Sequence, residues 1–126
     1  PGIYSARYAG INANSKKNIK KLLEETKDIP KSKRQARFVC VLVMFHFPQD
    51  PYPLICQASW EGELLFSAQG QKGFGYDPIF WVPTHQCSAA ELTDTIKNQI
   101  SHRAKAFRIF QDELKGQASP HSTLKV

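Results

Sequence analysis

Two long apolar runs dominate the middle of the chain. Residues 36–47 are almost continuously apolar and rich in β-branched and aromatic side chains, which predicts a strand covered on both faces. Residues 53–68 form a second run of similar length, after a turn at residues 48–51 that contains two prolines. The short connection and the matched lengths predict an antiparallel hairpin.

Helical patterns lie on either side of this hairpin. Asn14 or Ser15 is a suitable N-cap for a helix that runs to about Lys27, with apolar side chains on one face and lysines on the other. A second helix is predicted from about Ser101 to Lys115, and Gly116 lies just past its end. Its apolar stripe consists of Ile100, Ala104, Phe107, Phe110 and Leu114.

Shorter elements fill the remainder. Residues 69–78 read as a loop, residues 79–82 as a short strand, and Ser88 as the cap of a helical turn. Together these elements predict an α/β fold: a layered domain with a mixed, largely antiparallel sheet flanked by helices. We expect residues 1–126 to form a single domain, with residues 117–126 as a flexible tail.

Composition narrows the class of protein. The 126 residues carry a formal charge of +6, which favours anionic partners such as nucleotides, nucleic acids or anionic lipids without choosing among them. The densest basic segment, residues 31–37, fits either a phosphate-binding patch or a solvated loop that leads into a strand. Three cysteines without a C-x-x-C pair argue against a disulfide framework or a cysteine zinc site, and favour the reducing cytoplasm.

Candidate chemistry lies first in the segment Gly73-Phe74-Gly75-Tyr76-Asp77-Pro78. Glycines on both sides of Phe74 let the backbone approach a ligand, and an exposed ring there can stack on a nucleobase. Asp77 precedes a proline, which holds it in an extended or turn geometry. A tight turn whose aromatic rings belong to the core explains the same spacing.

The second candidate is Lys97 together with His102 and Arg103. Ser101 is a suitable N-cap, so His102 and Arg103 would lie in the first turn of a helix, where backbone N–H groups point outward. Arg103 can contact O6 and N7 of a 6-keto purine, whereas adenine presents an amino group at the first of these positions. A capped helix with exposed polar residues is the alternative explanation.

Other catalytic arrangements are absent from the sequence. The histidines at positions 46, 85 and 121 have no partner at metal-ligand spacing. There is no P-loop and no G-x-S-x-G motif.

Several motifs together resemble the inosine/xanthosine triphosphate pyrophosphatase family. They occur in the family's order and spacing from residue 1 to about residue 115, and the F-G-Y-D-P and S-H-R blocks are the most specific. The matching segments are residues 1–8 (PGIYSARY), 34–38 (RQARF), 73–80 (GFGYDPIF), 89–92 (AAEL), 97–98 (KN) and 101–104 (SHRA).

The resemblance implies a magnesium-dependent homodimer that hydrolyses ITP, dITP and XTP to the monophosphate and pyrophosphate. It implies a cytoplasmic enzyme of nucleotide metabolism that binds neither nucleic acid nor membrane. The residues that match the family's substrate-binding positions are Phe74, Gly75, Tyr76, Asp77, Lys97, His102 and Arg103.

The family also has an opening T/S-x-N-x-x-K loop and a D-D-S-G-L segment that carry the metal ligands and the catalytic aspartate. Neither occurs in this chain, so its catalytic residues are unknown and none of its residues is predicted to bind metal. We therefore expect these 126 residues to be inactive alone. The alternatives are a non-catalytic module that binds 6-keto purine nucleotides and, less well supported by motifs, a nucleic-acid-binding protein.

Overall fold

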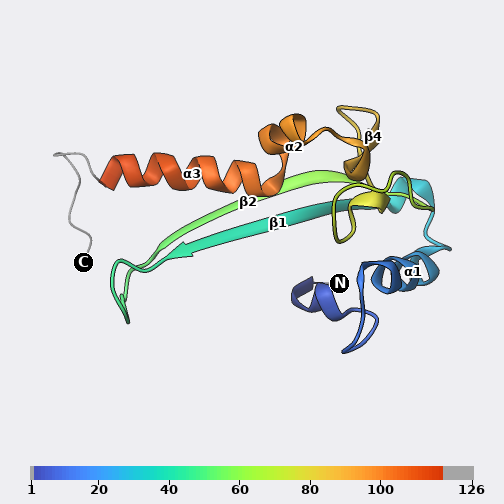
Figure 1. Cartoon of the computed structure of the whole chain (residues 1–126), viewed down its shortest axis with the longest axis horizontal. Helices are drawn as coiled ribbons and strands as arrows, with labels where there is room; N and C mark the ends of the chain where they lie inside the picture. The colour runs from blue at the N-terminus through green and yellow to red at the C-terminus, as the bar shows by residue number, and fades with distance from the viewer. Residues whose placement is uncertain (1, 118–126) are drawn as a thin grey trace. The chain divides into compact units, whose positions relative to one another are not determined.

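The computed structural model describes residues 2–117 (Figure 1). The predicted flexible tail lies, apart from residue 117, outside the described residues. The chain divides into two compact units. Unit 1 comprises residues 1–37 and 61–93, and unit 2 comprises residues 38–60 and 94–126. The expected organisation as one domain stays a prediction.

The sheet has four strands in the order β1-β2-β3-β4. The predicted hairpin is confirmed: β1 (Gln35–Met44) and β2 (Leu54–Leu64) are the two long strands (Figure 1). The strands β3 (Phe80–Val82) and β4 (Cys87–Ser88) are short, and each pairs antiparallel with its predecessor. With its helices, this arrangement is the predicted α/β fold.

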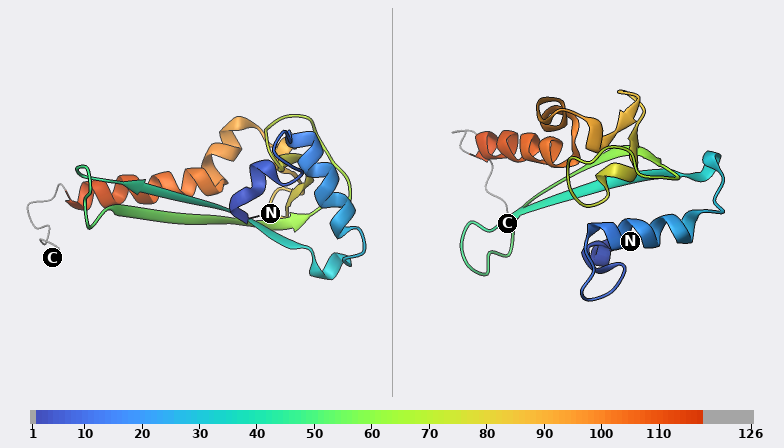
Figure 2. Two further views of the ribbon diagram at one scale, coloured as in Figure 1. Left: turned by 90° about the horizontal axis from the view of Figure 1, so that it is seen from below. Right: turned by 45° about the vertical axis from the view of Figure 1, so that its right-hand side comes forward.

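Helix α1 (Ser15–Thr26) belongs to unit 1 and begins as the sequence predicts. The Asn14 side chain accepts a hydrogen bond from the backbone N–H of Lys17 at 3.0 Å, which caps the helix. A 3₁₀ segment, Gly2–Arg7, precedes α1 and lies beside it in both views of Figure 2. Buried Asn18 joins the two, because its Nδ2 donates to Ala6 O at 3.1 Å and its Oδ1 accepts from Ala9 N at 2.9 Å.

The core of unit 1 lies around β3. Ile79, Phe80 and Val82 are buried, as are Ala89, Ala90 and Leu92 of the following turn. Ser88 and Glu91 form a reciprocal capping box, which confirms the predicted cap. Gly62 of β2 has to be glycine here, since a Cβ atom would collide with the Phe80 ring and the carbonyl oxygen of Trp81.

The basic segment 31–37 contains one residue that is not solvated. Arg34 is only 3% exposed, and its guanidinium donates to four backbone carbonyl oxygens at 2.6–3.0 Å. These carbonyls belong to Thr26, Ile29, Leu64 and Leu65. Arg34 therefore ties the end of α1 to the end of β2, and the prediction of a solvated loop is wrong at this position.

Unit 2 contains the remaining parts of β1 and β2 with two helices. Helix α3 (His102–Gln117) runs along this part of the hairpin (Figure 1) and matches the predicted second helix. Helix α2 (Asp94–Ile100) was not predicted. It is a short helix without a strong apolar stripe, so its periodicity is weak.

The buried side chains of unit 2 include Leu54, Cys56 and Trp60 of β2 and Ala106 of α3. The predicted stripe of α3 is wrong in one respect. Phe107 is 54% exposed, and Ala106, which the stripe left out, is fully buried. Residues one position apart differ by 100° around a helix, so a side chain at the edge of a broad apolar stripe can face solvent.

One face of β1 in unit 2 is also more exposed than predicted. Val39, Val41 and Val43 are each about half exposed, and Ile55 of β2 is 60% exposed. Burial alternates along β1, so only one of its faces is covered by the described residues. The prediction of a strand covered on both faces is wrong for this part of the chain.

None of the helices within residues 2–117 is long and apolar enough to cross a membrane.

Candidate functional site

The first candidate segment, residues 73–78, lies in a loop of unit 1 with both ends anchored. The backbone N–H of Gln69 donates to Pro78 O at 2.8 Å, so the start and the end of the loop are joined. The Ser88 hydroxyl donates to Gln69 O at 2.7 Å and fixes the same end to the core. A loop closed in this way holds its intervening residues in a defined position.

Asp77 organises the inside of the loop. It is 5% exposed, and its Oδ2 accepts a hydrogen bond from the backbone N–H of Phe74 at 3.1 Å. Gly73 has a φ of +82°, and a Cβ atom at this position would collide with Asp77 Oδ2. The glycine therefore permits both the left-handed backbone and the close approach of the carboxylate.

Phe74 is held by its backbone while its ring faces outward. The side chain is 58% exposed, although a phenylalanine gains most when buried. The alternative explanation, a turn whose aromatic rings belong to the core, is wrong for this ring. Gly75, with a φ of +61° and open space around it, completes the turn. An exposed ring on an ordered loop is available to stack on a planar ligand.

Tyr76 points the other way, into unit 1. Its hydroxyl donates to Ser5 O at 2.6 Å, and burial raises the pKa of the phenol. The loop is thereby connected to the 3₁₀ segment Gly2–Arg7, which Asn18 holds against α1. Tyr76 is a positioning residue in this structure, and its ring is not the exposed one.

The second candidate segment lies in unit 2, where α2 meets α3. Ser101 is buried, and its hydroxyl oxygen accepts from Ala104 N at 3.2 Å, which confirms the predicted N-cap. The next residue, His102, has its ring stacked on Phe38 with a centroid separation of 4.9 Å and an interplanar angle of 17°. Its ring centroid lies 6.2 Å from that of Trp60. The Phe38 and Trp60 centroids lie 5.9 Å apart, so the imidazole packs against both aromatic rings in one cluster with β1 and β2.

Arg103 and Lys97 complete this segment. Arg103 is exposed in the first turn of α3, and Lys97 is half-buried on α2. The backbone N–H of Ser101 donates to Lys97 O at 3.0 Å, so the two helices share a compact junction. A guanidinium placed at a helix N-terminus, on a junction fixed by buried neighbours, suits the recognition of hydrogen-bond acceptors.

The seven predicted substrate-binding residues therefore form two local groups. Phe74, Gly75, Tyr76 and Asp77 belong to the loop of unit 1, and Lys97, His102 and Arg103 belong to the helix junction of unit 2. Sequence reasoning missed Asn18 and Ser5, which hold the loop through Tyr76. The only sequence signal for a structural role of Asn18 is that it is a polar residue one helical turn before apolar Leu22 of α1.

No cluster of three histidine, cysteine, aspartate or glutamate side chains within residues 2–117 is arranged to hold a metal ion. Asp77, the buried carboxylate of the candidate loop, is occupied by the backbone of that loop.

Cys56 and Cys87 are poor candidate nucleophiles. Burial raises the pKa of the Cys56 and Cys87 thiols, which favours the unreactive protonated form.

With the fold and the two residue groups described, comparison with known proteins gives the family. The sequence model of the Ham1 family matches residues 1–113. The chain is an α/β protein that belongs to the Ham1 family. The recognition of the family from its F-G-Y-D-P and S-H-R blocks is confirmed.

Two curated relatives illustrate the similarity. The chain is 53% identical over 108 residues to a protein of Photobacterium profundum named dITP/XTP pyrophosphatase. It is 52% identical over 115 residues to a protein of the same name from Escherichia coli. These alignments cover 86% and 91% of the chain, but 55% and 58% of the relatives. The chain therefore spans a little over half the length of these curated relatives.

Solved structures of Ham1 proteins are also similar to the chain. A HAM1 protein from Coxiella burnetii matches with a TM-score of 0.86 and 47% identity, over 91% of the chain and 58% of that protein. The Ham1 protein of Staphylococcus aureus matches with a TM-score of 0.86 and 42% identity, over 93% of the chain and 59% of that protein.

Proposed function

We propose that this chain supplies the purine-recognition part of a nucleoside triphosphate pyrophosphatase. The whole protein would hydrolyse ITP, dITP and XTP to the monophosphate and pyrophosphate, and so remove abnormal purine nucleotides. Relatives named dITP/XTP pyrophosphatase at about half sequence identity support this proposal. The observation that carries it is the exposed Phe74 ring, fixed by Asp77 on a loop that the family motif includes.

We propose two kinds of contact with the purine: stacking on its face and hydrogen bonds to its edge. Phe74 stacks on the purine, as an exposed ring on an anchored loop can do at a gain of about 1–3 kcal/mol per base. Arg103 donates two hydrogen bonds to O6 and N7 of a 6-keto purine. Adenine carries an amino donor in place of O6, so ATP is rejected. GTP shares O6 and N7, so its 2-amino group has to meet a mismatch elsewhere in the site.

His102 and Lys97 have supporting roles in this proposal. The rings of Phe38 and Trp60 fix the imidazole of His102, and His102 precedes Arg103 in the same helical turn. Lys97 contributes a positive charge for the anionic nucleotide. Asp77 and Tyr76 position the loop, and Gly75 lets its backbone turn beneath the base.

Three further properties belong to the proposal. The reaction uses a magnesium ion whose ligands and catalytic carboxylate come from residues other than those described. The protein is a homodimer, which the half-exposed valines of β1 support, because exposed apolar side chains gathered on one face favour association. We propose the cytoplasm as its compartment, with three free cysteines in support.

The test is pyrophosphate release from ITP, GTP and ATP in the presence of magnesium. The 126-residue chain and the longest natural translation product that contains it are assayed side by side. We expect the longer product to release pyrophosphate from ITP well above GTP and ATP, and the chain alone to release none.

The outcome of this assay distinguishes an enzyme from a non-catalytic nucleotide-binding module. Release from ITP by the longer product supports the enzyme. Binding of ITP without release by either protein would instead favour a non-catalytic module for 6-keto purine nucleotides. Turnover by the 126-residue chain would contradict the expectation that it is inactive alone.

A further inference from the structure

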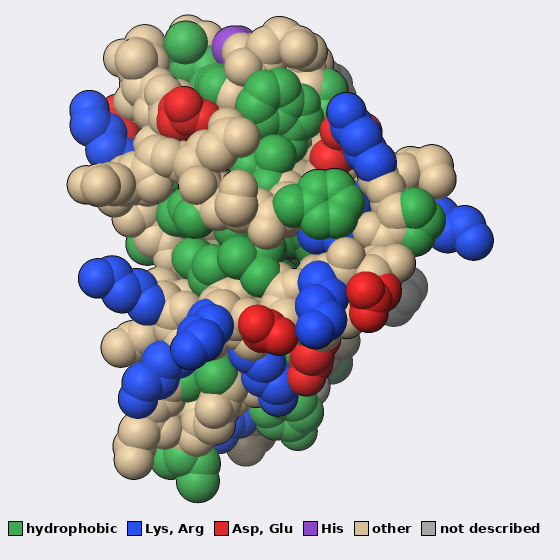
Figure 3. Space-filling view, turned by 90° about the vertical axis from the view of Figure 1, so that its right-hand side faces the viewer, with side chains coloured by type: hydrophobic (Ala, Val, Ile, Leu, Met, Phe, Trp, Pro, Cys, Tyr) green, Lys and Arg blue, Asp and Glu red, His purple; other side chains and the backbone are tan. Residues whose placement is uncertain are grey.

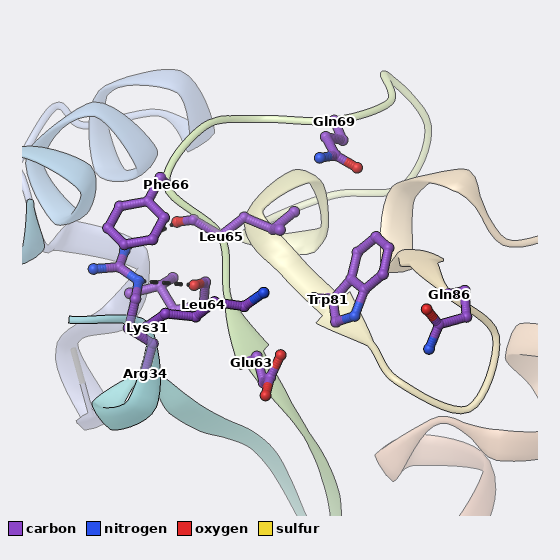
Figure 4. A pocket seen from close by; sticks show the side chains of 9 residues that line it. All are labelled: Lys31, Arg34, Glu63, Leu64, Leu65, Phe66, Gln69, Trp81 and Gln86. Carbon is purple, nitrogen blue, oxygen red and sulfur yellow. Dashed lines mark hydrogen bonds between the residues drawn. The ribbon is translucent and has the colours of Figure 1, made fainter. Parts of the chain in front are cut away.

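A cavity of about 370 Å³ lies in unit 1, apart from the residues of both candidate groups. Leucine and aromatic side chains form its apolar part, and charged and amide side chains complete it (Figure 4). The lining residues are Lys31, Arg34, Glu63, Leu64, Leu65, Phe66, Gln69, Trp81 and Gln86. The volume lies at the lower end of the range that small-molecule sites occupy.

The wall beside Arg34 is rigid. The guanidinium donates to four backbone carbonyls and lies 3.9 Å from the centroid of the Phe66 ring, so its donors are used in the fold. The cation that remains for a ligand is Lys31, which is exposed on the 3₁₀ segment Lys31–Lys33. In Figure 3, Lys and Arg side chains, with Asp and Glu side chains among them, lie on both sides of exposed hydrophobic side chains.

Trp81 and Glu63 line the cavity together. The two residues are direct cross-strand partners in the antiparallel pairing of β2 and β3, so their side chains project from the same face of the sheet. Trp81 is only partly buried, and Phe66 is 54% exposed. A flat aromatic surface and a carboxylate acceptor are therefore presented side by side.

Gln86 lies in the turn between β3 and β4 and lines the cavity. It has a φ of +51°, a left-handed conformation that glycine or asparagine adopts more readily than glutamine. Its Nε2 donates to Pro83 O at 2.7 Å, which leaves Oε1 as an acceptor. The turn therefore presents an oriented amide to the cavity.

We propose that this cavity is a second ligand site, for a planar heteroaromatic compound that carries one anionic group, such as a nucleoside monophosphate. The heterocycle stacks on Trp81. Its ring N–H donates to Glu63 or to Gln86 Oε1, and Gln69 provides a further amide. The anionic group binds the ammonium of Lys31. The proposal does not depend on the function of the Phe74 loop, because the two sets of residues are different.

The experiment is isothermal titration calorimetry of the 126-residue chain with inosine monophosphate, inosine and inorganic phosphate. We expect inosine monophosphate to bind, inosine to bind more weakly and phosphate alone to show no measurable binding. Trp81→Leu keeps apolar volume but removes the aromatic face, and should weaken binding about tenfold or more. Lys31→Ala should bring inosine monophosphate to the affinity of inosine, whereas Lys33→Ala, a neighbouring exposed lysine outside the lining, should change nothing.

The variant Gln86→Gly distinguishes a loss of ligand affinity from a loss of stability. It relieves the left-handed strain, so the melting temperature should stay the same or rise while the affinity falls. Phe74→Ala and Arg103→Ala identify the site that is occupied. If these two variants abolish binding and Trp81→Leu does not, the ligand occupies the proposed purine-recognition residues and the second site is disproved. An absence of binding, or binding unaffected by Trp81→Leu and Gln86→Gly, would also overturn the proposal.

Discussion

The carboxylate of Asp77 accepts the backbone N–H of Phe74 at 3.1 Å, and this contact orders the loop while the Phe74 ring remains exposed. A buried carboxylate thus holds the backbone of a residue three positions earlier, whose ring is exposed. The loop motif combines a positioning residue with a residue available for contact, and substitutions at the two positions should act differently.

The two glycines of the loop give the first prediction. Gly73→Ala should be more damaging than Gly75→Ala, since both positions have a positive φ but only Gly73 faces the Asp77 carboxylate. The left-handed backbone costs an alanine about 1–2 kcal/mol at either position. We expect Gly73→Ala to lose additional stability and ITP affinity, measured by denaturant unfolding and calorimetry. Equal effects of the two variants would contradict the proposed role of Asp77.

Arg34 gives a prediction about stability. Arg34→Lys keeps the charge but cannot reach four carbonyls, so the free energy of unfolding should fall by about 2 kcal/mol or more. Lys33→Ala, an exposed neighbour, should stay within about 0.5 kcal/mol of the parent chain. Urea denaturation measures both variants, and an Arg34→Lys variant as stable as the parent would refute this role.

The hairpin turn predicts a pH dependence. The backbone N–H of Tyr52, then that of His46, and the His46 ring lower the pKa of Asp50 below its ordinary 3.8. A lowered pKa stabilises the fold above the ordinary value, and this contribution is lost as the pH falls through the lowered one. Asp50→Ala should therefore reduce the melting temperature at pH 7 and have less effect in acid, below the lowered pKa.

The control is His46→Ala, which keeps the backbone N–H that Asp50 accepts. It should have a smaller effect than Asp50→Ala at pH 7. Thermal melting followed by circular dichroism distinguishes the two. A destabilisation by Asp50→Ala that is the same at both pH values would exclude the charged hydrogen bonds as its cause.

The valine face of β1 predicts association. Val41→Lys places a charge in the middle of the half-exposed apolar face, so a dimer formed through it should dissociate. Gln111→Lys adds the same charge at an exposed position of α3 and should leave the dimer intact. Analytical ultracentrifugation measures both. A parent chain that remains monomeric at all concentrations would disprove association through this face.

Strong local signals made most of the fold predictable from sequence. Asn14 and Ser101 are caps with well-defined hydrogen bonds, and the hairpin combines a short turn with two long apolar runs. Helix α2 has only seven residues and lacks such a pattern. The exposure of Phe107 depends on tertiary packing, which periodicity along one helix does not contain.

The candidate site was predictable as motifs but not as geometry. The glycines around Phe74 indicate a close turn, yet nothing local shows that Asp77 turns inward while Phe74 turns outward. The contact of Tyr76 with Ser5 joins residues 71 positions apart, and Arg34 reaches Leu65 across 31 positions. Such long-range hydrogen bonds to backbone carbonyls leave no periodic trace in the sequence.

The most direct test of purine recognition is calorimetric binding of ITP and ATP to the 126-residue chain and to its Arg103→Ala variant. We expect ITP to bind about tenfold or more tightly than ATP, and Arg103→Ala to remove this preference while circular dichroism shows an unchanged fold. Equal affinity for ITP and ATP, or a preference that survives Arg103→Ala, would contradict this expectation.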